Sequence, residues 1–252
     1  MPTLVIGFIV GAIAGSAATA LADRYDRPRE FLIGRSSCPH CHAQLRWFEL
    51  IPIISWLTQR GQCRSCRWPI GVEVLAVEVG SAIVGAGVAS QFGLGWLTAL
   101  IWIVLVVLGA LIIVDIAEQQ LPDRLILVSL PFLVAIGWLA PTIGLTVPSS
   151  ALGILVGGGF LLLLWFVTKG RGIGLGDVKL ASAFGLGLGY PIAIVMLFAA
   201  FMLGGAWSIG LLATGRAKFG QQVRVPFGPF LILGYFVALL AGRSILTWYG
   251  LV

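Results

Sequence analysis

Charged side chains are scarce in this chain. Only 10% of its 252 residues are Asp, Glu, Lys or Arg, and 59% are hydrophobic, whereas soluble domains carry about 25% charged residues. A soluble domain this apolar would precipitate, so the composition excludes that class and predicts a polytopic membrane protein. The net charge is +6. Proteins that bind single-stranded nucleic acid interleave basic and aromatic residues along a groove. This chain has no such run, so nucleic acid is excluded as a partner.

Other common features are missing as well. The chain has no long repeat, heptad run or low-complexity tail, and it has no glycine-rich nucleotide fingerprint. No basic residue precedes the first apolar run at 4–22, which is also long for a signal peptide. We therefore expect an uncleaved first helix, although Ala20-Leu21-Ala22 resembles a cleavage site. Nothing in the sequence indicates an oligomeric state.

The apolar segments predict an all-α membrane protein with about eight transmembrane helices. About 20 apolar residues are needed to cross a bilayer. Candidate spans lie near 4–22, 73–91, 96–114, 125–140, 149–168, 178–190, 191–214 and 227–249. In the first span Gly7, Gly11 and Gly15 recur every four residues, a spacing that favours close helix packing. The predicted domains are a first helix (1–22), a zinc-binding domain (23–72) and a seven-helix membrane domain (73–252).

Basic residues predict the orientation of these helices. Segment 23–72 is the only long polar stretch and holds eight of the sixteen Lys and Arg residues, namely Arg24, Arg27, Arg29, Arg35, Arg46, Arg60, Arg64 and Arg67. The positive-inside rule therefore makes it cytoplasmic. Eight spans then put loops 115–124, 169–177 and 215–226 on the same side, and Lys179 lies just inside the next helix at that edge. Arg243 is the only basic residue left on the other side.

Four cysteines form two C-x-x-C pairs in the polar segment. Cys38 and Cys41 are separated by 21 residues from Cys63 and Cys66. This spacing is typical of a tetrahedral zinc site, and four thiolates would leave no open position, so the ion would be structural. Redox dithiols or two disulfides are the alternatives, but a reducing cytoplasm disfavours both. His40 and His42 are candidate substitute ligands or simple loop residues.

Two carboxylates are expected to lie at one membrane face. Asp115 directly follows the apolar run that ends at Val114, and Asp177 starts a helix after the glycine-rich stretch Gly172–Gly176. An ionisable residue at a membrane edge is costly and indicates function. Two carboxylates that share a proton can act as the acid and the base of an aspartic protease. We expect the glycines to allow a tight turn beside Asp177.

Two further acids, Asp123 and Glu118, lie in the loop after Asp115. Asp123 follows Pro122 and is either an N-cap or part of the chemistry, and Glu118 is expected to be a solvated loop residue. The alternative function is a transporter or channel with a zinc-stapled cap, in which the aspartates relay ions. That function expects carboxylates near the bilayer midplane, whereas both aspartates are predicted at one edge. A structural assembly factor would leave the two aspartates unexplained.

Several motifs in order resemble the type IV prepilin peptidases, which are membrane aspartyl proteases of the glycine-x-glycine-aspartate class. The first half carries Gly15-Ser16 before Arg24, Ser37–Cys41, Ile51–Leu57, Gly61–Cys66 and Glu78. The second half carries Asp115 with Leu121-Pro122-Asp123, Gly174–Leu180 and Pro226–Phe230. A short glycine motif alone is weak evidence. Its combination with the cysteine pairs and the Asp115 stretch is specific.

This resemblance implies that Asp115 and Asp177 are the catalytic residues, with Gly174, Gly176 and Lys179 supporting the substrate loop. The implied substrates are type IV prepilin or pseudopilin precursors, cut after a basic leader at the cytoplasmic face of the bacterial inner membrane. The products would feed type IV pili or type II secretion. It also implies methylation of the new amino terminus with S-adenosylmethionine, for which Glu73 and Glu78 are candidate residues.

Overall fold

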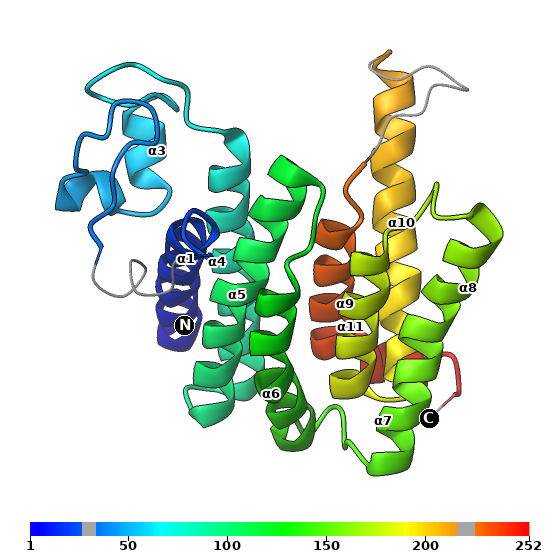
Figure 1. Ribbon diagram of the computed structural model, residues 1–252. Helices are drawn as coiled ribbons and strands as arrows, with labels where there is room; N and C mark the ends of the chain where they lie inside the picture. The colour runs from blue at the N-terminus through cyan, green and yellow to red at the C-terminus, as the bar shows by residue number, and fades with distance from the viewer. Residues whose placement is uncertain (27–33, 216–224, 252) are drawn as a thin grey trace. The chain divides into compact units, whose positions relative to one another are not determined.

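The computed structural model of the protein describes residues 1–26, 34–215 and 225–251 (Figure 1). Five basic residues used to predict the orientation lie outside these ranges, namely Arg27, Arg29, Arg216, Lys218 and Arg224. Within the described ranges the regular elements are helices, with two isolated β-bridges, so the all-α prediction is confirmed. The chain forms two compact units, Met1–Ala117 and Glu118–Val252.

All eight predicted spans correspond to helices. Among the described residues, six helices are long and apolar enough to cross a membrane: α1 (Pro2–Ala22), α4 (Val72–Phe92), α5 (Trp96–Glu118), the continuous helix Val147–Thr168, α10 (Ile192–Ala213) and α11 (Gly228–Trp248). The other two are shorter, with 17 residues in α6 (Asp123–Leu139) and 14 in α9 (Leu175–Leu188). The count of eight is therefore approximate as a count of spans.

In the first unit, α1 packs closely along α4 through small residues (Figure 1). A methyl group added at Gly7 or Gly11 would overlap the backbone of α4, and at Gly15 it would lie 2.7 Å from Cα of Glu78. The predicted glycine face is thus confirmed, because only glycine lets the two backbones approach this closely. Gly109 brings α5 to the same pair, since a methyl group there would lie 2.7 Å from Cβ of Ala18.

The polar part of the first unit has little regular structure. A short 3-10 helix, η1 (Trp47–Leu50), contacts the single-turn helix α3 (Ile54–Thr58). Both lie between the two cysteine pairs in sequence, and α4 begins six residues after Cys66. We call the described residues 34–71 the cysteine segment.

In the second unit, α9 is the central helix. It contacts α6, α7 (Val147–Ile154), η2 (Leu155–Gly159), α8 (Phe160–Thr168), α10 and α11, and Figure 1 shows it among these helices. Leu180, Ala181, Phe184 and Leu188 of α9 are buried. The short helix that begins at the glycine-rich stretch is therefore packed against most elements of its unit, while Leu175 and Lys179 near its start are exposed.

A π-helical turn, η2, interrupts the helix Val147–Thr168 at Gly157-Gly158-Gly159. A methyl group at Gly157 would lie 2.6 Å from the carbonyl oxygen of Ala181, so glycine is required for this contact with α9. Turns of this kind are frequent near functional sites. This turn could not be predicted from the sequence, because a glycine triplet does not distinguish a π turn from an ordinary close contact.

Candidate active site and metal centre

The four cysteine sulfur atoms converge in the cysteine segment. All four lie within 4.8 Å of one another, and Sγ of Cys38 lies 3.8 Å from Sγ of Cys66. Zinc–sulfur bonds of about 2.3 Å in a tetrahedron place sulfur atoms about 3.8 Å apart. The cysteines are free rather than disulfide-bonded. The donor set and its spacing therefore fit a zinc ion, and four sulfur ligands fit a structural one.

The backbone repeats one pattern around each cysteine pair. The N–H of Cys38 donates to the carbonyl of Ala43 at 3.0 Å, and the N–H of Cys63 donates to that of Trp68 at 2.8 Å. An isolated β-bridge closes each loop, from Ser37 to Gln44 and from Gln62 to Pro69. Each loop turns through a residue with positive φ, His42 and Arg67. The two loops thus present their cysteines with matching geometry.

Electrostatics favour one thiolate at this centre, because the pKa of Cys38 is lowered while that of Cys66 is raised. Burial disfavours ionisation of Cys38, but backbone N–H groups of Cys41 and His40 and neighbouring thiols outweigh it and lower its pKa to about 7. The His40 ring does not join the four sulfur atoms in the metal cluster. It stacks on Trp68 with ring centroids 4.2 Å apart. The expectation that His40 is a loop residue agrees with this contact.

Asp115 lies in the last turn of α5, which continues to Glu118, so the residue is inside the helix rather than in the loop after it. Its side chain is 5% exposed. The apolar run ends at Val114, whereas α5 continues for one more turn to Glu118. The sequence pattern missed this turn because it contains the charged residues Asp115 and Glu118. A carboxylate this buried is rare without a functional or structural reason.

Asp177 lies in the first turn of α9, as predicted, and is 8% exposed. Its Oδ2 accepts a hydrogen bond from the N–H of Gly174, the N-cap residue, at 3.0 Å. α9 is not among the six candidate spans. Burial raises the pKa of Asp177 to about 6, although the Gly174 hydrogen bond opposes the shift. The carboxyl group therefore retains its proton much closer to neutral pH than an ordinary aspartate does.

The stretch after Asp115 reaches the start of α9 within the second unit. Nζ of Lys179 lies 2.8 Å from both carboxylate oxygens of Asp123. The N-cap of α6 is Pro122, so the N-cap hypothesis for Asp123 is wrong. Leu121 covers Gly176, where a methyl group would lie 3.0 Å from its Cβ. These contacts join the Leu121-Pro122-Asp123 stretch to the turn of helix that carries Asp177.

The tight turn before α9 is made by different residues from those expected. Lys169 and Gly170 have positive φ values of 52° and 73°, whereas Gly172, Gly174 and Gly176 are not among the residues with positive φ. Gly176 is needed instead for the close approach of Leu121. The support of a substrate loop by Gly174, Gly176 and Lys179 stays a prediction.

The two candidate glutamates of α4 differ in their surroundings. Glu78 is 4% exposed, and its Oε2 accepts the N–H of Ile53 at 2.6 Å. Glu73 is half-buried in the first turn of α4, a position that the helix dipole favours for an acid. Its carboxylate folds over Gly71, where a methyl group would overlap it. Sequence reasoning singled out Glu78 but missed its partner Ile53.

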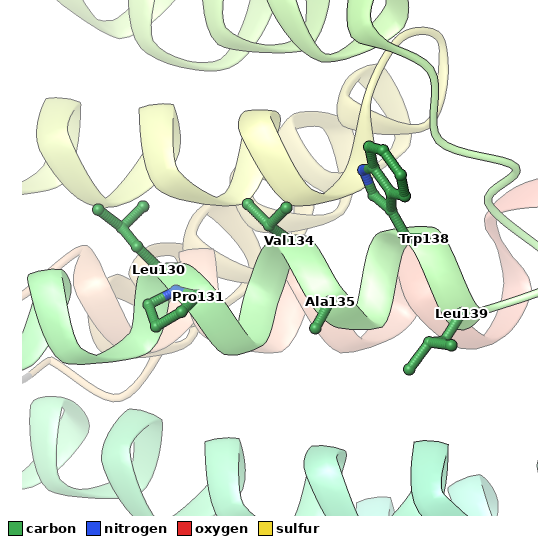
Figure 2. Close-up of a pocket in the computed structure, with 6 residues that line it drawn as sticks. All are labelled: Leu130, Pro131, Val134, Ala135, Trp138 and Leu139. Carbon is green, nitrogen blue, oxygen red and sulfur yellow. The ribbon is translucent and has the colours of Figure 1, made fainter.

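The second unit also carries an apolar hollow on its surface. Figure 2 shows its six lining side chains, all from α6: Leu130, Pro131, Val134, Ala135, Trp138 and Leu139. None of them is charged, and they share one face of a single helix. An apolar strip of this kind suits contact with hydrocarbon or another helix rather than chemistry.

Asp115 belongs to the first unit and Asp177 to the second. That their carboxylates meet stays a prediction.

Comparisons with known proteins match two regions of the chain, one with the cysteines and one with the aspartates. Residues 9–92, which include the cysteines and Glu78, match the Bacterial Peptidase A24 N-terminal domain. Residues 102–209, which include both aspartates, match the Type IV leader peptidase family. No solved structure gives a significant match.

Curated relatives align over most of the chain. Three of them, each named prepilin leader peptidase/N-methyltransferase, come from Aeromonas hydrophila, Bacillus subtilis (strain 168) and Stutzerimonas stutzeri. The first is 34% identical over 88% of this chain and 77% of the relative. The second is 33% identical over 98% and 97%, and the third is 30% identical over 98% and 92%. With these matches and its paired cysteine loops, this chain belongs to the type IV leader peptidase family.

Proposed function

We propose that this protein is a membrane aspartyl endopeptidase that removes the short basic leader of type IV prepilin-like precursors and then methylates the new amino terminus. The observation that carries the proposal is a pair of buried aspartates, Asp115 and Asp177, inside the region matched to the Type IV leader peptidase family. Relatives named for both activities support it. The transporter alternative has no support among them.

In this proposal Asp115 and Asp177 form one catalytic pair. Ionised Asp115 takes a proton from a water molecule, and the resulting hydroxide attacks the scissile carbonyl carbon. Asp177 is assigned as the acid because burial raises its pKa to about 6, which favours its protonated form relative to an ordinary aspartate, and it gives its proton to the carbonyl oxygen. When the C–N bond breaks, the leaving amine takes the proton that Asp115 received, and one hydroxyl of the tetrahedral diol returns its proton to Asp177, which leaves a carboxylic acid. The proton shared by such a pair titrates as a property of both groups.

The proposed site faces the cytoplasm. A precursor with a basic leader keeps that leader on the cytoplasmic side while its apolar helix enters the bilayer. The cut must then be made at the same membrane edge, where the basic loops of this chain are predicted to lie. The substrates are accordingly type IV prepilins or pseudopilins of a bacterial inner membrane.

The methylation step is assigned to the amino-terminal part of the chain. S-adenosylmethionine would supply the methyl group. Oε2 of Glu78 already accepts a backbone hydrogen bond, whereas Glu73 is half-buried at the start of α4. Glu73 therefore remains the better candidate for cofactor contact. Zinc held by the four cysteines would stabilise this part, which corresponds to the proposed domain 23–72, between the first helix (1–22) and the membrane domain (73–252).

A reconstituted reaction tests the proposed function. The purified protein in lipid bilayers is incubated with a pilin-like precursor and S-adenosylmethionine, and the product is analysed by mass spectrometry. We expect a shortened chain that carries one added methyl group on its amino terminus. A precursor supplied without its leader serves as a control that should be methylated without cleavage. Recovery of only intact precursor would contradict the proposal.

A further inference from the structure

The backbone at Ile53 is held in an unfavourable conformation. Its φ of 65° and ψ of −53° lie outside the regions that L-residues normally adopt. The N–H of Ile54 donates to the carbonyl oxygen of Pro52 at 2.6 Å, which closes a three-residue γ-turn of the strained hand. Isoleucine is β-branched, so a positive φ is a genuine outlier here. Such a conformation persists only where surrounding groups impose it.

A buried carboxylate holds this turn. Oε2 of Glu78 accepts the N–H of Ile53 at 2.6 Å, and the Ser16 side chain of α1 also hydrogen-bonds to Glu78. Glu78 lies where α4 packs closely against α1, because a methyl group at Gly15 would lie 2.7 Å from its Cα. Polar groups so deeply buried are normally hydrogen-bonded, and the loss of one partner of such a bond is costly.

The position of Ile53 gives this contact a consequence for the cysteine segment. Ile53 lies between the two cysteine loops and is the N-cap of α3. A second contact lies at the other end, where Arg24 donates to the carbonyl oxygens of Gly34 at 3.2 Å and Arg35 at 2.9 Å. The loss of Glu78 would therefore free the middle of the segment while its first residues stay attached to the end of α1.

We propose that Glu78 is a positioning residue for methyl transfer, which fixes the cysteine segment against helices α1 and α4 through the strained turn at Ile53. This inference rests on the proposed function and deepens it. Glu78 and the cysteine segment lie in the match to the amino-terminal domain, and both aspartates lie in the other match. Loosening the segment should therefore impair methylation far more than cleavage.

Substitutions at Glu78 separate positioning from simple packing. In Glu78→Ala the acceptor is lost, and we expect methylation to fall by about tenfold or more, with cleavage retained. Glu78→Gln keeps an oxygen that can accept the Ile53 N–H, so it should retain methylation. Gly80→Ala, on the same helix and with nothing within 4 Å of the added methyl group, is the matched control for hydrogen exchange and should exchange as the wild type does. Equal loss of both activities in Glu78→Ala, or no rescue by Gln, would overturn the proposal.

Substitution of Ile53 provides an independent test of the same contact. Glycine adopts a positive φ without steric cost, so Ile53→Gly should partly restore the Glu78→Ala variant. Ile53→Ala should not, because alanine keeps the Cβ that disfavours this backbone. If both double variants behave alike, the strained turn is not what Glu78 controls.

Amide hydrogen exchange tests the hydrogen bond between Ile53 and Glu78 without any enzymatic assay. Glu78→Ala should accelerate exchange of the amides in 53–57, whereas exchange in the first cysteine loop (38–43) and the zinc content should stay as in the wild type. Unchanged exchange in 53–57 would contradict the tether. If the wild-type protein does not methylate but this exchange result is obtained, the methyltransferase assignment fails and the Glu78–Ile53 contact stands.

Discussion

Lys179 and Asp123 form an ion pair in which Nζ of Lys179 donates to both oxygens of the Asp123 carboxylate, at 2.8 Å each. The pair joins the first residue of α6 to the first turns of α9, two residues beyond Asp177. Both side chains are more than half exposed. The pair therefore contributes less than about 1 kcal/mol to stability, and it links the start of α6 to the start of α9.

Charge reversal tests this ion pair. Lys179→Glu places two carboxylates together and should lower cleavage of a pilin-like precursor by about tenfold, because small displacements of a catalytic group are costly. The double variant Asp123→Lys/Lys179→Glu restores opposite charges and should recover most of the activity. A double variant as impaired as Lys179→Glu would show that the pairing itself is not what matters.

The raised pKa of Asp177 predicts a pH-dependent stability. Its folded pKa of about 6 exceeds the reference value of 3.8. Between these two values the unfolded chain loses the proton while the folded protein keeps it. The contribution of Asp177 to the free energy of unfolding is therefore fully present below about pH 4 and falls by about 3 kcal/mol as pH rises to about 6. Asp177→Asn cannot ionise, so its unfolding temperature should rise relative to the wild type between these pH values. A difference that does not change with pH would contradict the buried carboxyl assignment.

Glycine substitutions test the α1–α4 contact. A methyl group at Gly11 would overlap the backbone of Ser81, whereas one at Gly80 of α4 would meet nothing within 4 Å. Gly11→Ala should destabilise the protein by about 1–3 kcal/mol through overpacking. Gly80→Ala, the matched control, should be neutral or slightly stabilising, because alanine favours helix. Thermal unfolding in detergent measures both variants, and equal stability would argue against this packing.

Removal of one cysteine tests the metal centre. The wild-type protein should contain about one zinc ion per chain, and Cys63→Ser should lose it because a structural site needs all four thiolates. Ser65 lies in the same loop but is not one of the four cysteine ligands, so Ser65→Ala should retain the metal. Elemental analysis of the purified variants decides the matter. Full zinc content in Cys63→Ser would rule out the four-cysteine site.

Much of the fold follows from one-dimensional patterns. Apolar runs identified every long helix, the spacing of Cys38, Cys41, Cys63 and Cys66 predicted their cluster, and Gly7, Gly11 and Gly15 predicted the close contact with α4. These features depend on periodicity or local spacing, which a sequence displays directly.

Contacts between distant residues could not be predicted in the same way. The bond from Ile53 to Glu78 and the pairing of Lys179 with Asp123 depend on how separate helices pack. Backbone conformation was equally hidden. The turn before α9 uses Lys169 and Gly170 rather than the expected glycines, and Pro122 rather than Asp123 is the N-cap of α6.

Cleavage by the single variants Asp115→Asn and Asp177→Asn tests the central claim most directly. Each substitution preserves size and polarity but removes the ionisable group. We expect each to lower the rate of precursor cleavage by at least about a hundredfold, the contribution of a general acid or base. Glu118→Gln, one turn beyond Asp115 and exposed, is the matched control and should cleave normally. Wild-type cleavage by either aspartate variant would contradict the catalytic pair.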